Sequence, residues 1–307
     1  MKTLQIEQII DCDRCGEKHK RVFEANLTVA QLERKELVSA PFFICPNIAL
    51  MYRVVAYSFD FTVNIFKSNN IEEQKRFSNQ LQEKWGSVDF ENKLKRYIDL
   101  DMQYLGIPEE YYGLLKPIID SYCCGLYYPA ITSIGSLGER ILNRLIIKTR
   151  THFKTSVHYR KVWNKNSFDQ WDNVINILKD WEIITDEVAT LFVELKQYRN
   201  FSIHYNENYD FEHNCHKAIK IISQIINLQF NYIKRKDLFW VFDVPGEIWL
   251  RTEMIDNPFV KEFVLQNCVI ASPYCEPFAS PPTRGENIPL KPLSDEEFIE
   301  LRKSRKG

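Results

Sequence analysis

The sequence predicts a mainly α-helical protein, in which a bundle of four to five helices is flanked by a small β-containing N-terminal module and a C-terminal α+β extension. Three observations support this fold class. Apolar residues recur with a helical period through the middle of the chain. Helix-start residues stand before these stretches. At both ends of the chain, short β-type runs alternate with turn residues instead.

The 307 residues are enough for two domains and a terminal appendage. We divide them into an N-terminal module (1–67), connecting helices (68–107), the helical bundle (108–236) and a C-terminal extension (237–307). Within the first part, residues 21–25 alternate like a strand, and residues 40–46 and 52–57 are expected to be further extended segments. Residues 71–100 are expected to be helical, with a break at Gly86.

The bundle is expected to begin at Pro108, because a proline followed by the acids Glu109 and Glu110 is typical of a first helical turn. Further amphipathic helices are predicted over residues 129–150, over residues 167–181, after the capping residue Thr185, and over residues 211–234. The connections between these helices are short, which is typical of a bundle.

The C-terminal extension changes character. Residues 239–242 and 247–251 are predicted to be strands on either side of a turn at Pro245 and Gly246. Beyond residue 273 the chain is rich in proline, serine and charge, so residues 280–285 are expected to form an extended tail. A short polar helix is then predicted to start at Ser294.

Several classes of protein are disfavoured by the sequence. No stretch reaches the ~18 uninterrupted apolar residues of a membrane span, and the first seven residues lack the layout of a signal peptide. We therefore expect a cytoplasmic protein without a membrane partner, in which the eight cysteines are reduced thiols. The absence of P-loop, G-x-G-x-x-G, H-E-x-x-H and G-x-S-x-G motifs argues against the ATPases, dehydrogenases, metalloproteases and hydrolases that carry them.

The charge of the chain is unevenly distributed. The net charge is −1, so the molecule has no overall basic field, yet no Asp or Glu occurs between Arg140 and Phe168, where Lys and Arg recur. Basic side chains on phosphates release condensed counterions, so this segment predicts binding to a polyanion backbone; the alternative is a solvated helix face. Together with Tyr205, the residues expected to contact such a polyanion are Arg140, Arg144, Arg150, Arg160 and Lys161.

The most specific motif runs from Arg199 to His204, at the C-terminal end of the helix that Thr185 starts. A histidine transfers protons near neutral pH, and an arginine binds phosphate oxygens at two points and neutralises the charge of a transition state. RNA cleavage without a metal ion needs these two functions. On an ideal helix Arg199 and His204 point about 140° apart, so they converge best if the helix loosens after Asn200 or if two copies meet.

The R-x4-H spacing, the adjacent Asn200 and an upstream helix over residues 127–146 with Glu139 near its middle resemble the HEPN family of helical ribonuclease domains. The resemblance covers about residues 110–235. It implies that Arg199, Asn200 and His204 are catalytic, and that the active site forms where two bundles pair in a homodimer. It also implies metal-independent cleavage to a 2′,3′-cyclic phosphate, with no cofactor for catalysis.

The resemblance leaves alternatives open. Glu139 is a candidate catalytic residue that orients Arg199 or His204, or else it forms an ordinary salt bridge within the bundle. Tyr205 is expected to stack on a base or donate to a phosphate, or else it packs inside the protein. Enzymes of this family commonly act as toxins or phage-defence effectors, which implies RNA as substrate and a regulatory or inhibitory protein as a further partner. Other HEPN domains are non-catalytic and bind RNA, a nucleotide or a partner protein.

A possible metal site lies near the N-terminus. Cys12, Cys15 and the glycine after them resemble the first knuckle of a zinc ribbon, where two thiolates hold one tetrahedral zinc ion. Cys45 precedes a proline as in a second knuckle, and His19 is a candidate fourth ligand. The sequence therefore predicts a structural zinc on these four residues; the alternative is a degenerate ribbon that folds without metal. His213 and His216, which lie near Cys215 at the start of the last bundle helix, are three residues apart but have no obvious third ligand, so we interpret them as solvent-facing residues or polar residues of the bundle.

Overall fold

The computed structural model consists of two compact units. One comprises residues 1–55 together with 239–307, and the other comprises residues 56–238. The structure describes residues 2–11, 18–27, 51–54, 65–67, 69–102, 109–204, 207, 209–231, 239–241, 249–265, 268–271, 294–297 and 299–300. Over these residues the protein is mainly helical with small antiparallel sheets, as the sequence predicted.

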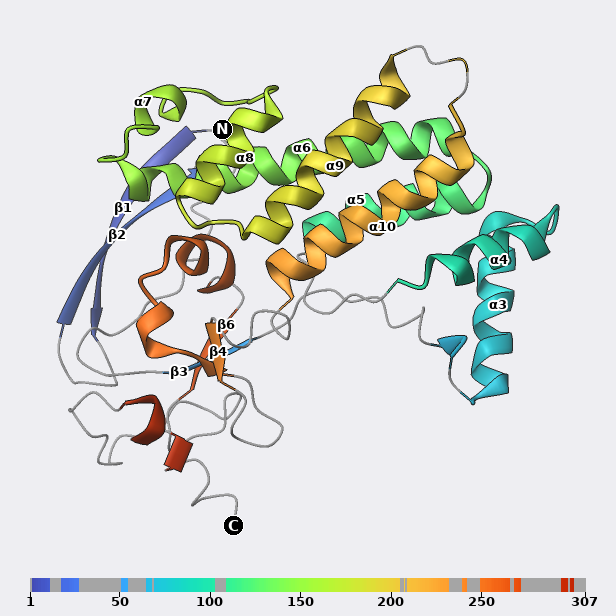
Figure 1. Cartoon of the computed structure of the whole chain (residues 1–307). Coiled ribbons are helices and arrows are strands. Elements are labelled where there is room, and N and C mark those ends of the chain that lie inside the picture. The colour runs from blue at the N-terminus through green and yellow to red at the C-terminus, as the bar shows by residue number, and fades with distance from the viewer. Residues whose placement is uncertain are drawn as a thin grey trace. The chain divides into compact units, whose positions relative to one another are not determined.

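The unit of residues 56–238 is helical. Its elements are α3 (Ile71–Trp85), α4 (Phe90–Leu100), α5 (Glu109–Cys123), α6 (Tyr127–Thr149), η1 (Arg150–Phe153), α7 (Tyr159–Val162), α8 (Trp171–Asp180), α9 (Asp186–Ile203) and α10 (Phe211–Phe230). Helix α6 packs against α5, α8, α9 and α10, which makes it the central element of the bundle. Figure 1 shows α9 and α10 passing obliquely over α6 and α5. The mainly helical character expected for this part of the chain is therefore confirmed, with α5, α8, α9 and α10 packed around α6.

The helices begin and end where local chemistry favours it. The side chains of Asn70, Thr185 and Asp210 accept hydrogen bonds from backbone N–H groups in the first turns of α3, α9 and α10. Each bond satisfies a donor that the helix itself leaves free. Gly86 ends α3 with a φ of 77°, a left-handed conformation that costs glycine little. The predicted break at Gly86 and the predicted cap at Thr185 are confirmed.

The core of the helical unit is formed by the apolar stripes that the sequence periodicity predicted. Ile134, Leu145, Phe192 and Ile222 are completely buried. The buried residues Trp171, Val174 and Leu178 of α8 close the same core from another side. Burial of each such side chain contributes roughly 1.5–3 kcal/mol. In the described part of the chain, no helix is long and apolar enough to cross a membrane.

The other unit is built from both ends of the chain. Strand β1 (Lys2–Asp11) pairs antiparallel with β2 (Lys18–Leu27), with Lys2 opposite Leu27. A second sheet has the order β4-β5-β3-β6. Its strands are β3 (Met51–Val54), β4 (Trp240–Val241), β5 (Trp249–Leu250) and β6 (Cys268–Ala271). The segments expected at 21–25, 52–57, 239–242 and 247–251 overlap β2, β3, β4 and β5, although the described residues Phe239 and Arg251 lie outside the strands.

Two further features of this unit follow from local sequence. A π-helical turn η3 (Val260–Val264) follows β5 after the short turn η2 (Thr252–Met254). The polar helix predicted at Ser294 is present over residues 295–297 and begins with a capping box. The hydroxyl of Ser294 accepts from the backbone N–H of Glu297, and the Glu297 carboxylate accepts from the N–H of Ser294. The expected segments 40–46 and 280–285 lie outside the described residues.

Candidate functional site

The candidate site lies where α6 and α9 cross, and two glycines allow the crossing to be close. A Cβ atom on Gly135 would stand 2.4 Å from Cγ of Arg199 and 3.0 Å from its Cβ. A Cβ atom on Gly138 would stand 2.8 Å from Leu195 and from the indole of Trp171. Real side chains do not approach so closely, so the backbone of α6 needs glycine at both positions. Gly135 therefore determines how near Arg199 lies to α6.

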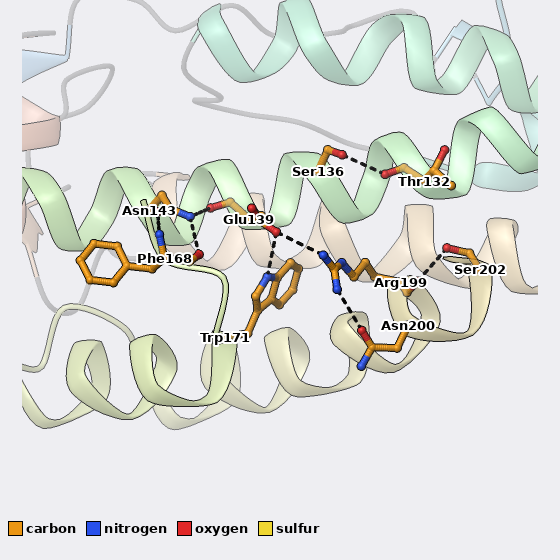
Figure 2. Close-up of polar contacts among 9 residues, drawn as sticks. All are labelled: Thr132, Ser136, Glu139, Asn143, Phe168, Trp171, Arg199, Asn200 and Ser202. Atoms are coloured by element: carbon orange, nitrogen blue, oxygen red, sulfur yellow. Dashed lines mark hydrogen bonds and ion pairs between the residues drawn. The ribbon is translucent and has the colours of Figure 1, made fainter. Parts of the chain in front are cut away.

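The guanidinium group of Arg199 is held by residues from two helices, as Figure 2 shows. Its Nη2 lies 3.6 Å from Oε2 of Glu139 on α6, and its Nη1 donates to Oδ1 of Asn200 at 3.2 Å. These contacts use two of the five N–H donors of a guanidinium group. About a third of the Arg199 side chain is exposed. The group can therefore bind an anion from solvent while it keeps its contact with Glu139 of α6.

Glu139 is itself held by a residue that the sequence did not single out. Nε1 of Trp171 donates to Oε2 of Glu139 at 3.4 Å, the same oxygen that faces Arg199 (Figure 2). Trp171 begins α8 and is buried. The indole thus links α8 to the ion pair between α6 and α9. A tryptophan inside an apolar stripe gives no such signal in the sequence, because packing alone explains it.

The polar strip of α6 extends on both sides of Glu139. Thr132, Ser136 and Asn143 share its face, as their spacing requires. The hydroxyl groups of Thr132 and Ser136 donate to carbonyls of their own helix. The Asn143 amide donates to the carbonyl of Phe168 at 3.0 Å and accepts from its N–H at 2.6 Å, which fixes the chain entering α8 (Figure 2). The strip is therefore partly structural, whereas Glu139 faces the arginine.

His204 stands at the end of α9 and is exposed. Its backbone N–H still donates to the carbonyl of Asn200 at 3.1 Å, but its φ and ψ of −98° and 143° are those of an extended residue. Helix α9 therefore stays regular through Ile203 and does not loosen after Asn200, which was one of the two conditions under which Arg199 and His204 were expected to converge. The other condition is the meeting of two copies. Ser202 reinforces the last turn by donating to the carbonyl of Arg199 at 2.8 Å.

The basic residues expected to contact RNA divide into two groups. Arg144 forms an ion pair with Glu110 and lies over the ring of Tyr111. Burial lowers the pKa of Arg144 from its usual value. Nη1 of Arg150 donates to the carbonyls of Val162, at 2.8 Å, and Lys165. Both guanidinium groups are thus engaged within the chain.

The remaining candidates for RNA contact are more accessible. Arg140, Arg160 and Lys161 are exposed. Arg140 also lines a groove of about 300 Å³ between α5 and α6. The groove is lined by Gly113, Leu114, Pro117, Ile118, Ser121, Ser133, Ser136, Leu137 and Arg140. Ser136 belongs both to this groove and to the polar strip, so the groove borders the candidate site along α6. Tyr205 lies outside the described residues.

Of the four expected metal ligands, the structure describes His19 alone. Cys12, Cys15 and Cys45 lie outside the described residues, and His19 lies on β2 opposite Ile10. Over the residues that the structure does describe, no group of three or more His, Cys, Asp or Glu side chains could hold a metal ion. His216 instead lies 3.0 Å from the hydroxyl of Tyr122 through its Nδ1 atom.

Burial shifts the pKa values of both residues in the contact between His216 and Tyr122. Burial, followed by the nearby Lys220, lowers the pKa of His216. Burial also raises the pKa of Tyr122, with a further contribution from Glu212. A neutral imidazole facing a neutral phenol can share one hydrogen bond, so this pair is well suited to the interior of the bundle. The interpretation of His216 as a polar residue of the bundle agrees with this environment.

Comparisons with known proteins do not add to the geometry. No protein-family model matches the chain, and no curated protein or solved structure is significantly similar to it. The functional argument therefore depends on the residues described above.

Proposed function

We propose that this protein is a metal-independent endoribonuclease of the HEPN type that acts as a homodimer. The observation that carries the proposal is the presence of a partly exposed arginine and an exposed histidine at the end of one helix. Arg199 is oriented by Glu139 and remains about one-third exposed, and His204 follows where α9 ends. Nothing in this arrangement occupies the guanidinium group fully, so a phosphate can still bind it.

The proposed reaction is attack by a ribose 2′-hydroxyl on the adjacent phosphorus. The O2′–P bond forms as the P–O5′ bond breaks, which leaves a 2′,3′-cyclic phosphate and a 5′-hydroxyl. One imidazole accepts the proton of the 2′-hydroxyl, and a second supplies a proton to the leaving 5′-oxygen. Arg199 neutralises the charge that builds up on the phosphate oxygens. With two copies of the chain, His204 of each copy can serve one of these two steps.

An exposed face of α9 supports the homodimer. Val193, Gln197, Asn200 and Phe201 lie at helical spacings of three, four, seven and eight residues, so they share one side of α9. Val193 and Phe201 are 42% and 54% exposed, although both are apolar. A second copy of α9 placed on this face would bury these side chains. A two-fold axis near the C-terminal end of α9 would also bring the two His204 residues toward the same region.

The accessible cations favour a polyanion as substrate. We propose that Arg140, Arg160 and Lys161 contact the RNA backbone, and that Arg144 and Arg150 support the protein structure instead. A role as a toxin or phage-defence effector in the cytoplasm, held in check by an inhibitory protein, rests on the family resemblance alone. A structural zinc on Cys12, Cys15, His19 and Cys45 is a separate part of the proposal and does not enter the reaction.

The direct test is incubation of the purified full chain with total RNA in the presence of EDTA. Cleavage should persist as long as the structural zinc stays bound, because no metal ion takes part in the proposed step. His204→Ala should lose about 10²–10⁴-fold in rate while RNA affinity largely remains. The matched control is His213→Ala, which removes another exposed histidine of the helical unit and should cleave at the wild-type rate. Undiminished cleavage by His204→Ala, or a requirement for added Mg²⁺, would refute the assignment.

Three further variants complete the test. Arg199→Ala should lose cleavage and part of the RNA affinity, because its charge contacts phosphate before and during the reaction. The double variant with His204→Ala should be little worse than the worse single one, since cooperating catalytic groups are strongly non-additive. Phe201→Ser should shift the protein from dimer to monomer in sedimentation velocity and lower activity with it. An active monomer would refute the shared site.

One observation favours a second candidate function, that of a non-catalytic module. The ion pair between Arg199 and Glu139 is also what a purely structural arginine would make. In that case the same surface binds RNA without cutting it. RNA affinity that depends on Arg199, together with no cleavage by the wild-type protein at any pH, would favour the binding module.

A further inference from the structure

The chain between α6 and α8 is irregular but firmly held. Arg150 donates to two carbonyls across the segment, at Val162 and Lys165. The rings of Phe153 and Trp181 stack with centroids 4.5 Å apart. Nε1 of Trp181 also donates to the hydroxyl of Ser156 at 2.9 Å. The surface that residues 150–168 present is therefore fixed in shape before any ligand binds.

This surface is positively charged. No acidic residue occurs in the segment, and the next one along the chain is Asp169. Asp180, which approaches the segment from α8, lies 2.8 Å from Nε2 of His158. Lys154, Arg160 and Lys161 are exposed, and within the described residues no ion pair is found for them. A polyanion would find these charges free of competing carboxylates.

Trp163 lies among these charges and is 55% exposed. The other tryptophans with a described exposure are all buried, namely Trp85, Trp171, Trp181 and Trp240. On α7, Val162 points into the core, whereas Arg160 and Trp163 are three residues apart and are neighbours on the outer surface. An indole left in water beside a guanidinium group has a flat face available for stacking.

We propose that Trp163, with Arg160 beside it, forms a stacking site for an unpaired base of single-stranded RNA. A base offers a π-face to the indole while one phosphate meets Arg160 and another reaches Lys161 on a different side of the same turn, since sequence-tolerant single-strand sites combine stacking with backbone charge contacts. A duplex keeps its bases stacked on one another and offers none to Trp163. The helix α7 spans four residues, too few for the long amphipathic face that anchors a protein to a membrane.

The proposed stacking site lies away from the reacting residues. It would therefore act on which RNA binds and not on the chemical step. Gly135, which touches Arg199, and Arg150, where the segment begins, are separated by about 22 Å along the axis of α6, from the 1.5 Å rise per residue. The inference rests on the proposed function, because it names the strand state of the RNA which that site would cut. Several nucleotides of one strand would lie between the stacked base and the scissile bond.

The test measures binding of a fluorescein-labelled single-stranded oligouridylate with 2′-deoxy sugars, which cannot be cleaved by 2′-hydroxyl attack. Trp163→Ala should weaken the Kd roughly 5- to 150-fold, the range that stacking of one base on an aromatic side chain contributes. Trp163→Phe should recover most of the affinity because it keeps an aromatic face. Val157→Ala, which trims another exposed apolar residue of the segment, should bind like the wild type.

Salt dependence separates stacking from charge. Trp163→Ala should leave the slope of log Kd against log salt unchanged. The Arg160→Ser and Lys161→Ser variants should each flatten it by up to about 0.7, the coefficient for a single-strand phosphate contact. A blunt duplex of the same length should bind equally well to wild type and Trp163→Ala. Because the side chain is exposed, the melting temperatures should agree, and this is checked for each variant.

The outcomes of this experiment and of the cleavage assay are distinct. Loss of affinity in Trp163→Ala without any RNA cleavage by the wild type supports the stacking site and counts against the proposed ribonuclease. Wild-type affinity in Trp163→Ala overturns the stacking site even if RNA is cleaved. Association with anionic phospholipid vesicles that depends on Trp163, with unchanged oligonucleotide binding, also overturns it and makes this surface a membrane contact.

Discussion

Replacement of Gly135 by alanine tests the central feature of the candidate site, the close approach of α6 to Arg199. The added methyl group would lie 2.4 Å from Cγ of Arg199 and 3.0 Å from its Cβ. Carbon atoms in contact are normally about 3.5–4.0 Å apart, so the stem of Arg199 must move by about 1 Å or the two helices must separate. Forcing extra volume into a packed contact costs about 1–3 kcal/mol. The better helix propensity of alanine offsets about 0.5–1 kcal/mol of this.

Gly113→Ala is the matched control, because it makes the same chemical change in the neighbouring helix α5. No heavy atom lies within 4 Å of the Cβ that it would add. Only the propensity gain remains there, so the control should be stabilised by about 0.5–1 kcal/mol. We therefore expect the two glycine variants to shift the free energy of unfolding in opposite directions. Urea unfolding followed by far-UV circular dichroism measures both values.

The same substitution should affect cleavage more than stability. A displacement of about 1 Å in a group that positions the reacting atoms can cost about 100-fold in rate. Folded Gly135→Ala should therefore cleave RNA about 100-fold more slowly, and Gly113→Ala should cleave at the wild-type rate. Equal stabilisation by both substitutions would show that α6 and α9 are not in close contact at Gly135. Full activity in a destabilised Gly135→Ala would show that the place of Arg199 does not matter for the reaction.

Three other predictions follow from single contacts. Trp171→Phe keeps the aromatic packing but removes the donor to Glu139, so it should cost about 0.5–1.5 kcal/mol in urea unfolding and slow cleavage several-fold; an unchanged rate would remove Trp171 from the site. Because burial depresses the pKa of His216, the unfolded chain takes up a proton that the folded chain resists. Stability should thus fall as pH drops below the ordinary histidine value of about 6.5, and His216→Gln should flatten this fall in pH-dependent melting. Elemental analysis of the full chain should find about one zinc, absent when both Cys12 and Cys15 are replaced by Ser.

The helical part of the fold could be predicted because its signals are local. The cap at Thr185 and the break at Gly86 depend on residues within one helical turn, and the apolar stripes need only a period of 3.6 residues. The sheet of the other unit is different. Strand β3 pairs with β5 and β6, some 200 residues later in the chain, and no local pattern records which distant strands will pair. The sequence therefore indicated individual strands but not their common sheet.

The candidate site was predicted only as far as residue type and spacing allowed. The R-x4-H motif identified Arg199 and His204, but the partners Gly135 and Trp171 come from tertiary contacts. From charge alone, all the arginines of the acid-free segment were expected to contact a polyanion. The structure distinguishes Arg150, whose guanidinium group joins two parts of a loop, from Arg160, which faces solvent. The formal charge of an arginine does not show whether its N–H groups already donate to backbone carbonyls.

The strength of the contact between Arg199 and Glu139 bears on the choice between catalysis and simple binding. The two groups are 3.6 Å apart, and each side chain is about one-third exposed. An ion pair of this kind contributes about 0–1 kcal/mol, because solvent screens it and it restricts two flexible side chains. Hydrogen bonds from a guanidinium group to a charged phosphate contribute about 1.5–3 kcal/mol each. An incoming phosphate can therefore take the guanidinium donors at small cost, while Glu139 and the absence of a side chain at Gly135 keep the arginine in place. A structural arginine would be expected to have its donors satisfied inside the protein, and Arg199 keeps an exposed part beside the point where α9 ends at His204.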